Sequence, residues 1–331
     1  MCSTYVMIDF KGLMQGIEWE KEVKIGSTIY VPITGKLSEV SDIDVALDGE
    51  GIQISELEPE SVNNVYVDSK SEGRKLVISG LIIEGGRQTR TVTRPFIIEK
   101  NEKRVIDVNC IEQGRWAYDN STPEFQMKGK MVSRKTKSTY VQGRRNSQSS
   151  TWNRVSQMMS EHDISKEAAP TQNFMEVEEK IKTHKKKELD EIRSKLKGVF
   201  SLEEQRGVLV IEDGRVTTIE VFDDINKWNR IKDRILDANL VDTLESKEKE
   251  ESTDKSARET FKSKLKSTEV EPLVDERSFK IVFHDLQGWG VGYGEQAIYL
   301  SLGWSEPMEE NGNELSQVQR VQNIIPDQRI E

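Results

Sequence analysis

The sequence predicts an α+β protein dominated by β-structure, with an antiparallel sandwich or barrel-like N-terminal part. Three observations predict it. The first 118 residues consist of short β-branched-rich runs separated by Gly, Asp, Asn and Ser. Apolar residues then recur at helical spacing in a middle segment. A second, smaller β-rich part follows, with one packed helix.

We expect residues 1–126 to form a β-rich lobe. Gly80 and the Gly85–Gly86 pair interrupt its apolar runs and mark bulges or tight bends. The predicted strands are Lys24–Ile33, Val45–Leu57, Val65–Val67, Lys75–Glu84, Arg90–Glu99 and Arg104–Glu112.

Residues 127–200 are predicted to hold a basic loop followed by helices. Apolar side chains from Trp152 to Met159 fall at helical spacing, and a further amphipathic helix spans about Phe174–Val199. In the third part, 201–305, two alternating runs flank Asp213–Gly214 and predict a hairpin. Asp223 or Asp224 then caps a helix over 224–244.

The remaining segments are polar or glycine-rich. A mobile insertion is expected at 245–267 and a polar tail at 306–331. The glycine run 288–294 resembles a phosphate-binding loop, but Glu295 and Gln296 follow it in place of a Lys and a Ser or Thr that open a helix. A β-turn or bulge is therefore the favoured interpretation.

Composition narrows the classes of function. The chain has 331 residues, a formal net charge of −10 and two cysteines. The acidic balance does not favour nucleic-acid binding by the whole molecule, and two cysteines cannot build a disulfide framework. No apolar run has the length of a membrane span, and Met1–Gly12 does not resemble a signal peptide. We therefore expect a soluble cytoplasmic protein with no membrane contact.

The sequence gives little support for a metal site or for a reactive cysteine. The three histidines lie in three different elements without cysteine partners, so no metal site and no cofactor are predicted. His284 beside Asp285 is more typical of a structural pair than of a catalytic base. Cys110 follows an apolar strand, where burial is the favoured interpretation.

The segment 128–154 carries basic side chains and no acidic one, against the balance of the molecule. It either binds a polyanion or is a solvated loop that offsets the acidic remainder. The predicted polyanion contacts are Arg134, Lys135, Arg144 and Arg145.

Two strand ends carry the densest polar and aromatic patch, between Glu84 and Trp116. At the first, a double glycine precedes Arg87, Gln88 and Arg90; at the second, Cys110 and Glu112 are followed by Arg115 and Trp116. Guanidinium groups bind phosphate or carboxylate and an indole offers a stacking face. The alternative is that the patch only joins two strands, with Arg115 paired to Glu112 and Trp116 in the core.

The segments Gly86-Arg87-Gln88-Thr89-Arg90 and Cys110-Ile111-Glu112-Gln113-Gly114-Arg115-Trp116, with Gln148 shortly before Trp152, resemble the domain family named for its association with ADP-ribosylglycohydrolases and rhodanese-phosphatases. The resemblance covers most of residues 25–303. It implies a largely β domain of unknown biochemical function and a ligand class near ADP-ribose or NAD derivatives. Thr89 departs from the Asn common in the family, and Ser79–Gly80 replaces its Gly-Glu, which puts an acidic role there in doubt.

The leading hypothesis is a binding or sensing module, more probable than an enzyme, for an anionic, nucleotide-like ligand. The predicted ligand-binding residues are Arg87, Gln88, Arg90, Glu112, Arg115, Trp116, Gln148 and Trp152. One alternative is a hydrolase or transferase acting on such a nucleotide, with Glu112 as acid or base. Another is an RNA-associated or scaffold protein that uses segment 128–154. Sequence does not predict the oligomeric state.

Overall fold

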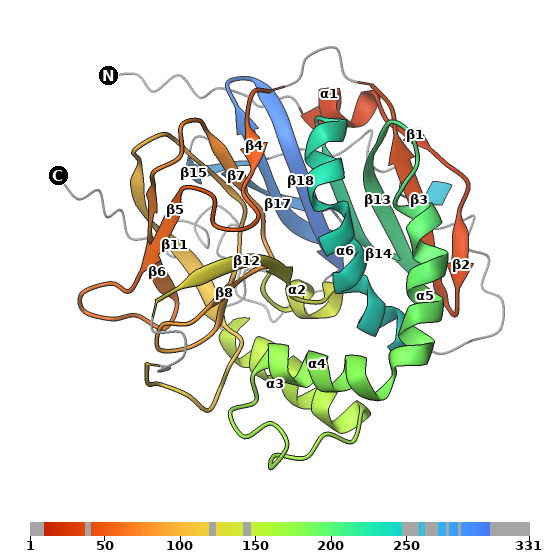
Figure 1. Cartoon of the computed structure of the whole chain (residues 1–331). Coiled ribbons are helices and arrows are strands. Elements are labelled where there is room, and N and C mark those ends of the chain that lie inside the picture. The colour runs from red at the N-terminus through yellow and green to blue at the C-terminus, as the bar shows by residue number, and fades with distance from the viewer. Residues whose placement is uncertain are drawn as a thin grey trace, which may run out of the picture.

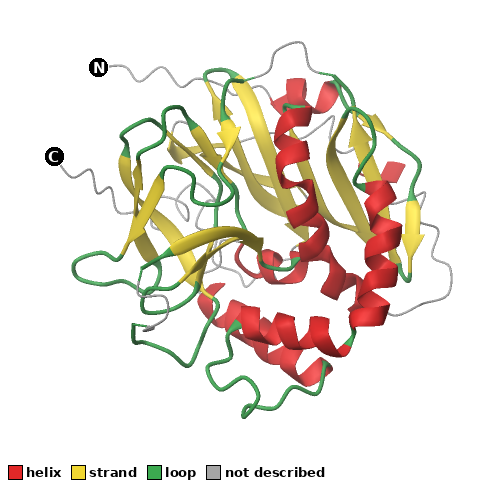
Figure 2. Ribbon diagram, in the orientation of Figure 1, coloured by secondary structure: helices red, strands yellow, loops and turns green. Residues whose placement is uncertain are grey.

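The computed structural model describes residues 10–36, 41–118, 124–141, 147–246, 258–259, 261, 271–275, 278–283 and 286–304. In this part of the chain strands occupy more residues than helices, and one sheet curls into a half-barrel. The predicted class, an α+β fold dominated by β-structure, is confirmed. Figure 1 and Figure 2 show strands at the left, back and right of the molecule, with helices in front and below.

The largest sheet is antiparallel and joins early strands, within 18–34, with late ones, within 205–222 and 271–304. Its strands run in the order β1-β3-β13-β14-β18-β17-β16-β15, and β2 pairs with the other end of β3. The bounds are β1 Glu18–Trp19, β2 Val23–Ile25, β3 Thr28–Thr34, β13 Gln205–Glu212, β14 Arg215–Phe222, β15 Glu271–Asp275, β16 Ser278–Phe283, β17 Leu286–Tyr293 and β18 Gln296–Trp304.

The early strands therefore do not all stay in one N-terminal lobe. Every residue of β3 is buried, and β3 pairs with β13 along its whole length. A strand that is apolar on both faces needs neighbours and cover on both sides, which the later part of the chain supplies. The strands before residue 126 are therefore divided between sheets. The sheet that contains β13 to β18 is the larger one.

The remaining strands form a six-stranded sheet, β12-β8-β9-β11-β6-β5, and a three-stranded sheet, β10-β7-β4. Their bounds are β4 Asp44–Val45, β5 Ile52–Ser55, β6 Asn64–Ser69, β7 Lys75–Val77, β8 Leu81–Glu84, β9 Arg90–Val92, β10 Phe96–Ile98, β11 Lys103–Cys110 and β12 Gln126–Met131. Gly80 (φ 93°) turns the chain from β7 into β8, and Gly85 and Gly86 (φ 98° and 54°) turn it towards β9. The predicted bends are thus confirmed.

Two sequence patterns are borne out in the large sheet. Asp213 and Gly214 both have positive φ, 52° and 72°, as a tight hairpin turn between β13 and β14 requires. The glycine run lies mainly in β17, which has a register shift at Val291–Gly292 and turns at Gly294 into β18. A strand, β18, follows the run directly, whereas a phosphate loop opens a helix.

The helices are α1 Phe10–Gln15, α2 Arg134–Val141, α3 Ser147–Glu161, α4 Phe174–His184, α5 Lys186–Val199 and α6 Ile225–Glu245. Helix α6 matches the predicted helix, and the Asp224 side chain caps it by accepting from the Asn226 N–H at 3.0 Å. The single helix expected over Phe174–Val199 is two helices, because Lys185 (φ −110°, ψ 25°) leaves the helical region.

Helix α2 and strand β12 replace most of the loop expected after residue 127. At the start of α2, the Asp242 carboxylate of α6 accepts from the Lys135 N–H at 2.7 Å. Ser133, directly before the helix, also caps it, because its hydroxyl accepts from the Thr136 N–H at 3.3 Å. The loop prediction was wrong because it did not use this local N-cap signal.

Helix α6 packs between the large sheet and the six-stranded sheet, where most of its side chains are buried (Figure 1). Trp228 of α6 is fully buried and stacks on Phe200 at a centroid distance of 5.6 Å. Smaller apolar clusters cover the other face of the large sheet and surround α3 and α4. None of the helices described here is long and apolar enough to cross a membrane.

Candidate functional site

The two strand ends singled out in the sequence lie side by side. Strand β9 pairs with β11 so that Arg90 stands opposite Cys110. Beyond the paired residues, the Gln88 side-chain amide donates to the Glu112 carbonyl at 3.0 Å. The structure therefore brings residues 84–90 and 110–116 together.

Glu112 is the centre of this junction. Its carboxylate accepts from the Thr89 N–H and hydroxyl, each at 3.0 Å, and from Arg115 Nε and Nη2 at 2.9 and 2.7 Å. Burial of the Glu112 side chain opposes ionisation, but Arg115 and Thr89 outweigh it and hold the pKa of Glu112 below its ordinary value. The carboxylate is thus ionised and fully occupied by protein donors.

Two of the predicted guanidinium groups bind the protein itself. Arg115 also donates from Nη1 to the carbonyls of Gly86 and Ala117, at 2.9 and 2.7 Å. The Arg90 side chain is completely buried and donates to Glu56 Oε2 at 2.9 Å and to the Ser61 carbonyl at 3.0 Å. These arginines fix the loops around the junction.

Gln148 and Trp152 reach the same junction from α3. The Gln148 amide accepts from the Cys110 N–H at 2.8 Å and donates to the Cys110 carbonyl at 2.7 Å, as a neighbouring strand would. The Trp152 indole lies near the Cys110 thiol, and burial raises the pKa of that thiol to about 11. The expected burial of Cys110 is confirmed.

The outer side of the junction carries an aromatic surface, formed by Glu60, Arg87, Trp116 and Tyr118. Trp116 and Tyr118 are 43% and 50% exposed. The Arg87 guanidinium lies 5.9 Å from the Trp116 ring and 4.7 Å from the Tyr118 ring. Glu60 forms an ion pair with Arg87 at 2.6 Å and accepts from the Tyr118 hydroxyl at 3.2 Å. Glu60 and Tyr118 were not predicted, although Tyr118 follows Trp116 at the spacing of side chains on one face of an extended segment.

The basic segment is largely neutralised inside the fold. Arg134 pairs with Glu212 at 2.9 Å, and Lys135 pairs with Glu212 and with Glu245 of α6 at 3.5 Å. Arg154 pairs with Glu245 at 2.6 Å. Arg144 and Arg145 lie outside the described residues, as do His284, Asp285, the tail after residue 305 and most of the 245–267 insertion.

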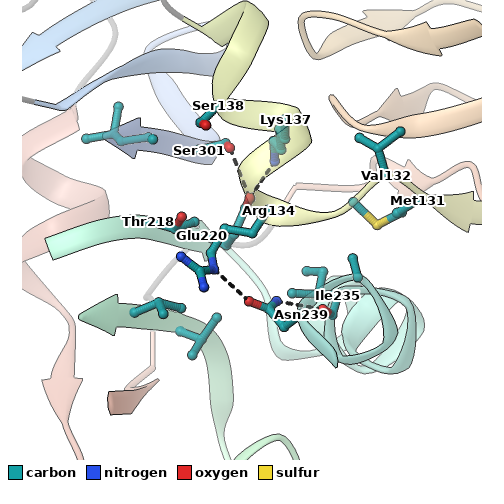
Figure 3. A pocket seen from close by; sticks show the side chains of 15 residues that line it. Met131, Val132, Arg134, Lys137, Ser138, Thr218, Glu220, Ile235, Asn239 and Ser301 are labelled. Carbon is teal, nitrogen blue, oxygen red and sulfur yellow. Dashed lines mark hydrogen bonds and ion pairs between the residues drawn. The ribbon is translucent and has the colours of Figure 1, made fainter. Parts of the chain in front are cut away.

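A small cavity of about 30 Å³ lies between α2, α6 and the strands β13, β14 and β18. Beside it, the buried carboxylate of Glu220 accepts from Lys137, from the Tyr299 hydroxyl and, at 3.0 Å, from the Ser301 hydroxyl. Figure 3 shows that Lys137, from α2, and Ser301, from β18, both point to Glu220. Sequence reasoning missed this cluster; the available signal is a polar residue on the inward face of an otherwise apolar strand.

The fold and junction define a class: a β-dominated α+β protein in which two strand ends and a helix are joined by a buried ionic network beneath an exposed aromatic surface. The chain belongs to the ARG and Rhodanese-Phosphatase-superfamily-associated Protein domain family, whose model matches residues 22–302. Comparison with curated proteins found no match, and comparison with solved structures found none.

Proposed function

We propose that this protein binds an anionic, nucleotide-like ligand at the aromatic surface of Glu60, Arg87, Trp116 and Tyr118. The observation that carries the proposal is the position of Arg87, whose guanidinium lies close to two aromatic rings that remain about half exposed. Exposed large aromatics next to a cation are a common means of binding a planar, negatively charged molecule.

Each group has a distinct task in this proposal. The Trp116 indole stacks on a base, which is worth about 1–3 kcal/mol where such contacts have been removed. Arg87 donates to a phosphate, and Glu60 accepts from a ribose hydroxyl. Arg115 and Glu112 hold the turn that carries Trp116, so the binding surface is ordered before the ligand arrives.

The name of the family suggests the ligand class. It records an association with ADP-ribosylglycohydrolases and rhodanese-phosphatases. ADP-ribose and NAD derivatives combine a base, ribose hydroxyls and phosphates, for which the aromatic surface offers a ring, a carboxylate and a guanidinium. We therefore place the ligand in that class, and the low cysteine count supports a cytoplasmic location.

A thermal-shift screen of the full chain against ADP-ribose, NAD and AMP, followed by calorimetry, tests the proposal. At least one of these nucleotides is expected to raise the melting temperature of the wild type. Replacing Trp116 by Ala is expected to weaken the binding of that nucleotide about tenfold or more. Leu202→Ala removes an apolar side chain of similar exposure elsewhere, 37%, and serves as the control. Equal binding by both variants contradicts the proposal.

The other two hypotheses gain less support. Glu112 accepts four protein hydrogen bonds and has a lowered pKa, which suits a structural anion better than an acid–base catalyst. Arg134 and Lys135, half of the proposed polyanion contacts, are paired with Glu212 and Glu245. We therefore assign both sets of residues to the stability of the fold.

A further inference from the structure

The cavity beside Glu220 has a lining of unusual charge for an interior space. It is lined by apolar side chains from α6 and β13 and by three charged ones, Arg134, Lys137 and Glu220. Glu220 pairs with Lys137, and Glu212, just outside the lining, pairs with Arg134. The three lining residues are at least 93% buried, so water screens their charges poorly.

Arg134 has a hydrogen-bond donor left over. Its Nε donates to Asn239 Oδ1 at 3.2 Å, and its Nη1 donates to Glu212 at 2.9 Å and to Thr217 at 3.1 Å. Its Nη2 is buried, and among the described residues no atom accepts from it. A buried donor without an acceptor is costly and rare in folded proteins.

The acceptors nearby are already in use. Glu220 accepts from Lys137, Tyr299 and Ser301. Asn239 Oδ1 accepts from Arg134, and Glu212, outside the lining, is shared between Arg134 and Lys135. Figure 3 shows how Arg134 reaches across to Asn239 while Lys137 turns to Glu220. Among the described residues, none of these groups therefore accepts from Nη2.

We propose that this cavity is a binding site for a monovalent anion of chloride size, held by Arg134 Nη2 beside the Lys137 ammonium. The cavity volume of about 30 Å³ is small, which favours a small anion such as a halide. A halide accepts hydrogen bonds without needing to donate any, which suits a donor that has no acceptor. The site is independent of the proposed nucleotide surface.

Bound in this position, the anion connects elements that are distant in sequence. Arg134 belongs to α2, Asn239 to α6 and Thr218 to β14, and all three line the cavity. Because the anion binds the folded chain and not the unfolded one, its concentration adds to stability by mass action.

Crystals of the full chain grown in sodium bromide test the site directly. We expect an anomalous bromine peak in the cavity within hydrogen-bonding distance of Arg134 Nη2. Density for water alone, with no bromine signal, overturns the proposal. This measurement uses the wild type and does not depend on whether a variant folds.

Solution measurements provide the second test. Replacing 200 mM gluconate by 200 mM chloride at constant ionic strength is expected to raise the melting temperature of the wild type by about 2–4 °C. Arg134→Lys is expected to lose this increment, whereas Arg154→Lys, a buried arginine outside the cavity lining, keeps it. Equal increments in the two variants would show a general salt effect and contradict the site.

Discussion

Arg115 forms a bidentate ion pair with the carboxylate of Glu112, three residues earlier in the chain. The Nε–Oε1 and Nη2–Oε2 distances are 2.9 and 2.7 Å. Gly114 makes the turn between them possible, because a Cβ at this position would lie 2.9 Å from the Thr171 Cα. The pair closes the end of β11 and places Trp116 at the surface.

Breaking this pair is expected to destabilise the protein. Arg115→Gln leaves the Glu112 carboxylate, whose side chain is 4% exposed, without its counter-charge. The free energy of unfolding in urea is expected to fall by about 3 kcal/mol. As a control, Lys100→Gln removes an exposed ion pair with Glu72 and is expected to leave stability almost unchanged. Equal effects in both variants would refute a buried role for Arg115.

The same pair predicts an acid-dependent loss of stability. The folded-state pKa of Glu112 lies below its ordinary value of 4.5, so its contribution is fully present above about pH 4.5. As pH falls through the lower folded-state pKa, Glu112 is protonated and the contribution disappears. Urea unfolding between pH 3 and 7 should therefore show a smaller stability difference between wild type and Glu112→Gln at the acid end. A difference that does not change with pH would contradict this assignment.

Cys110 is expected to be inert in the folded protein. Its thiol is buried, and burial raises its pKa to about 11, so little thiolate is available near neutral pH. In a Cys2→Ser background, iodoacetamide should alkylate Cys110 much more slowly in buffer than in concentrated urea. Mass spectrometry of the intact chain measures both rates. Rapid labelling of the native chain would contradict the buried position.

Gly288 is expected to resist substitution for a structural reason. A Cβ at residue 288 would stand 2.0 Å from the Ser301 carbonyl oxygen of the neighbouring strand. Gly288→Ala should lower the unfolding free energy by about 1–3 kcal/mol. Gly73→Ala is the control, because open space surrounds that position and its φ is not in the left-handed region. A stable Gly288→Ala protein would argue against the close pairing of β17 and β18.

Local patterns predicted the elements whose causes are local. The Asp213–Gly214 turn, the Asp224 cap of α6 and the bends at Gly80 and Gly85–Gly86 each depend on a few adjacent residues. The junction could also be anticipated, since its polar residues cluster at two strand ends and match a family pattern.

Tertiary partners explain what sequence reasoning could not reach. The cations of segment 128–154 looked available for a polyanion because their acids lie far along the chain, on β13, β14 and α6. The pairing of β3 with β13 likewise joins strands about 180 residues apart. Neither arrangement leaves a periodic or local signal in the residues concerned.

The central claim is that Arg87 and its aromatic neighbours bind the ligand, and a matched pair of arginine variants tests it most directly. Arg94 resembles Arg87: it pairs with Asp107 at 2.8 Å, lies 5.7 Å from the Trp289 ring and is 23% exposed, against 27% for Arg87. Calorimetric titration of ADP-ribose into Arg87→Gln and Arg94→Gln is the measurement. We expect about tenfold weaker binding in Arg87→Gln alone. Wild-type affinity in Arg87→Gln, or equal losses in both variants, would contradict the claim.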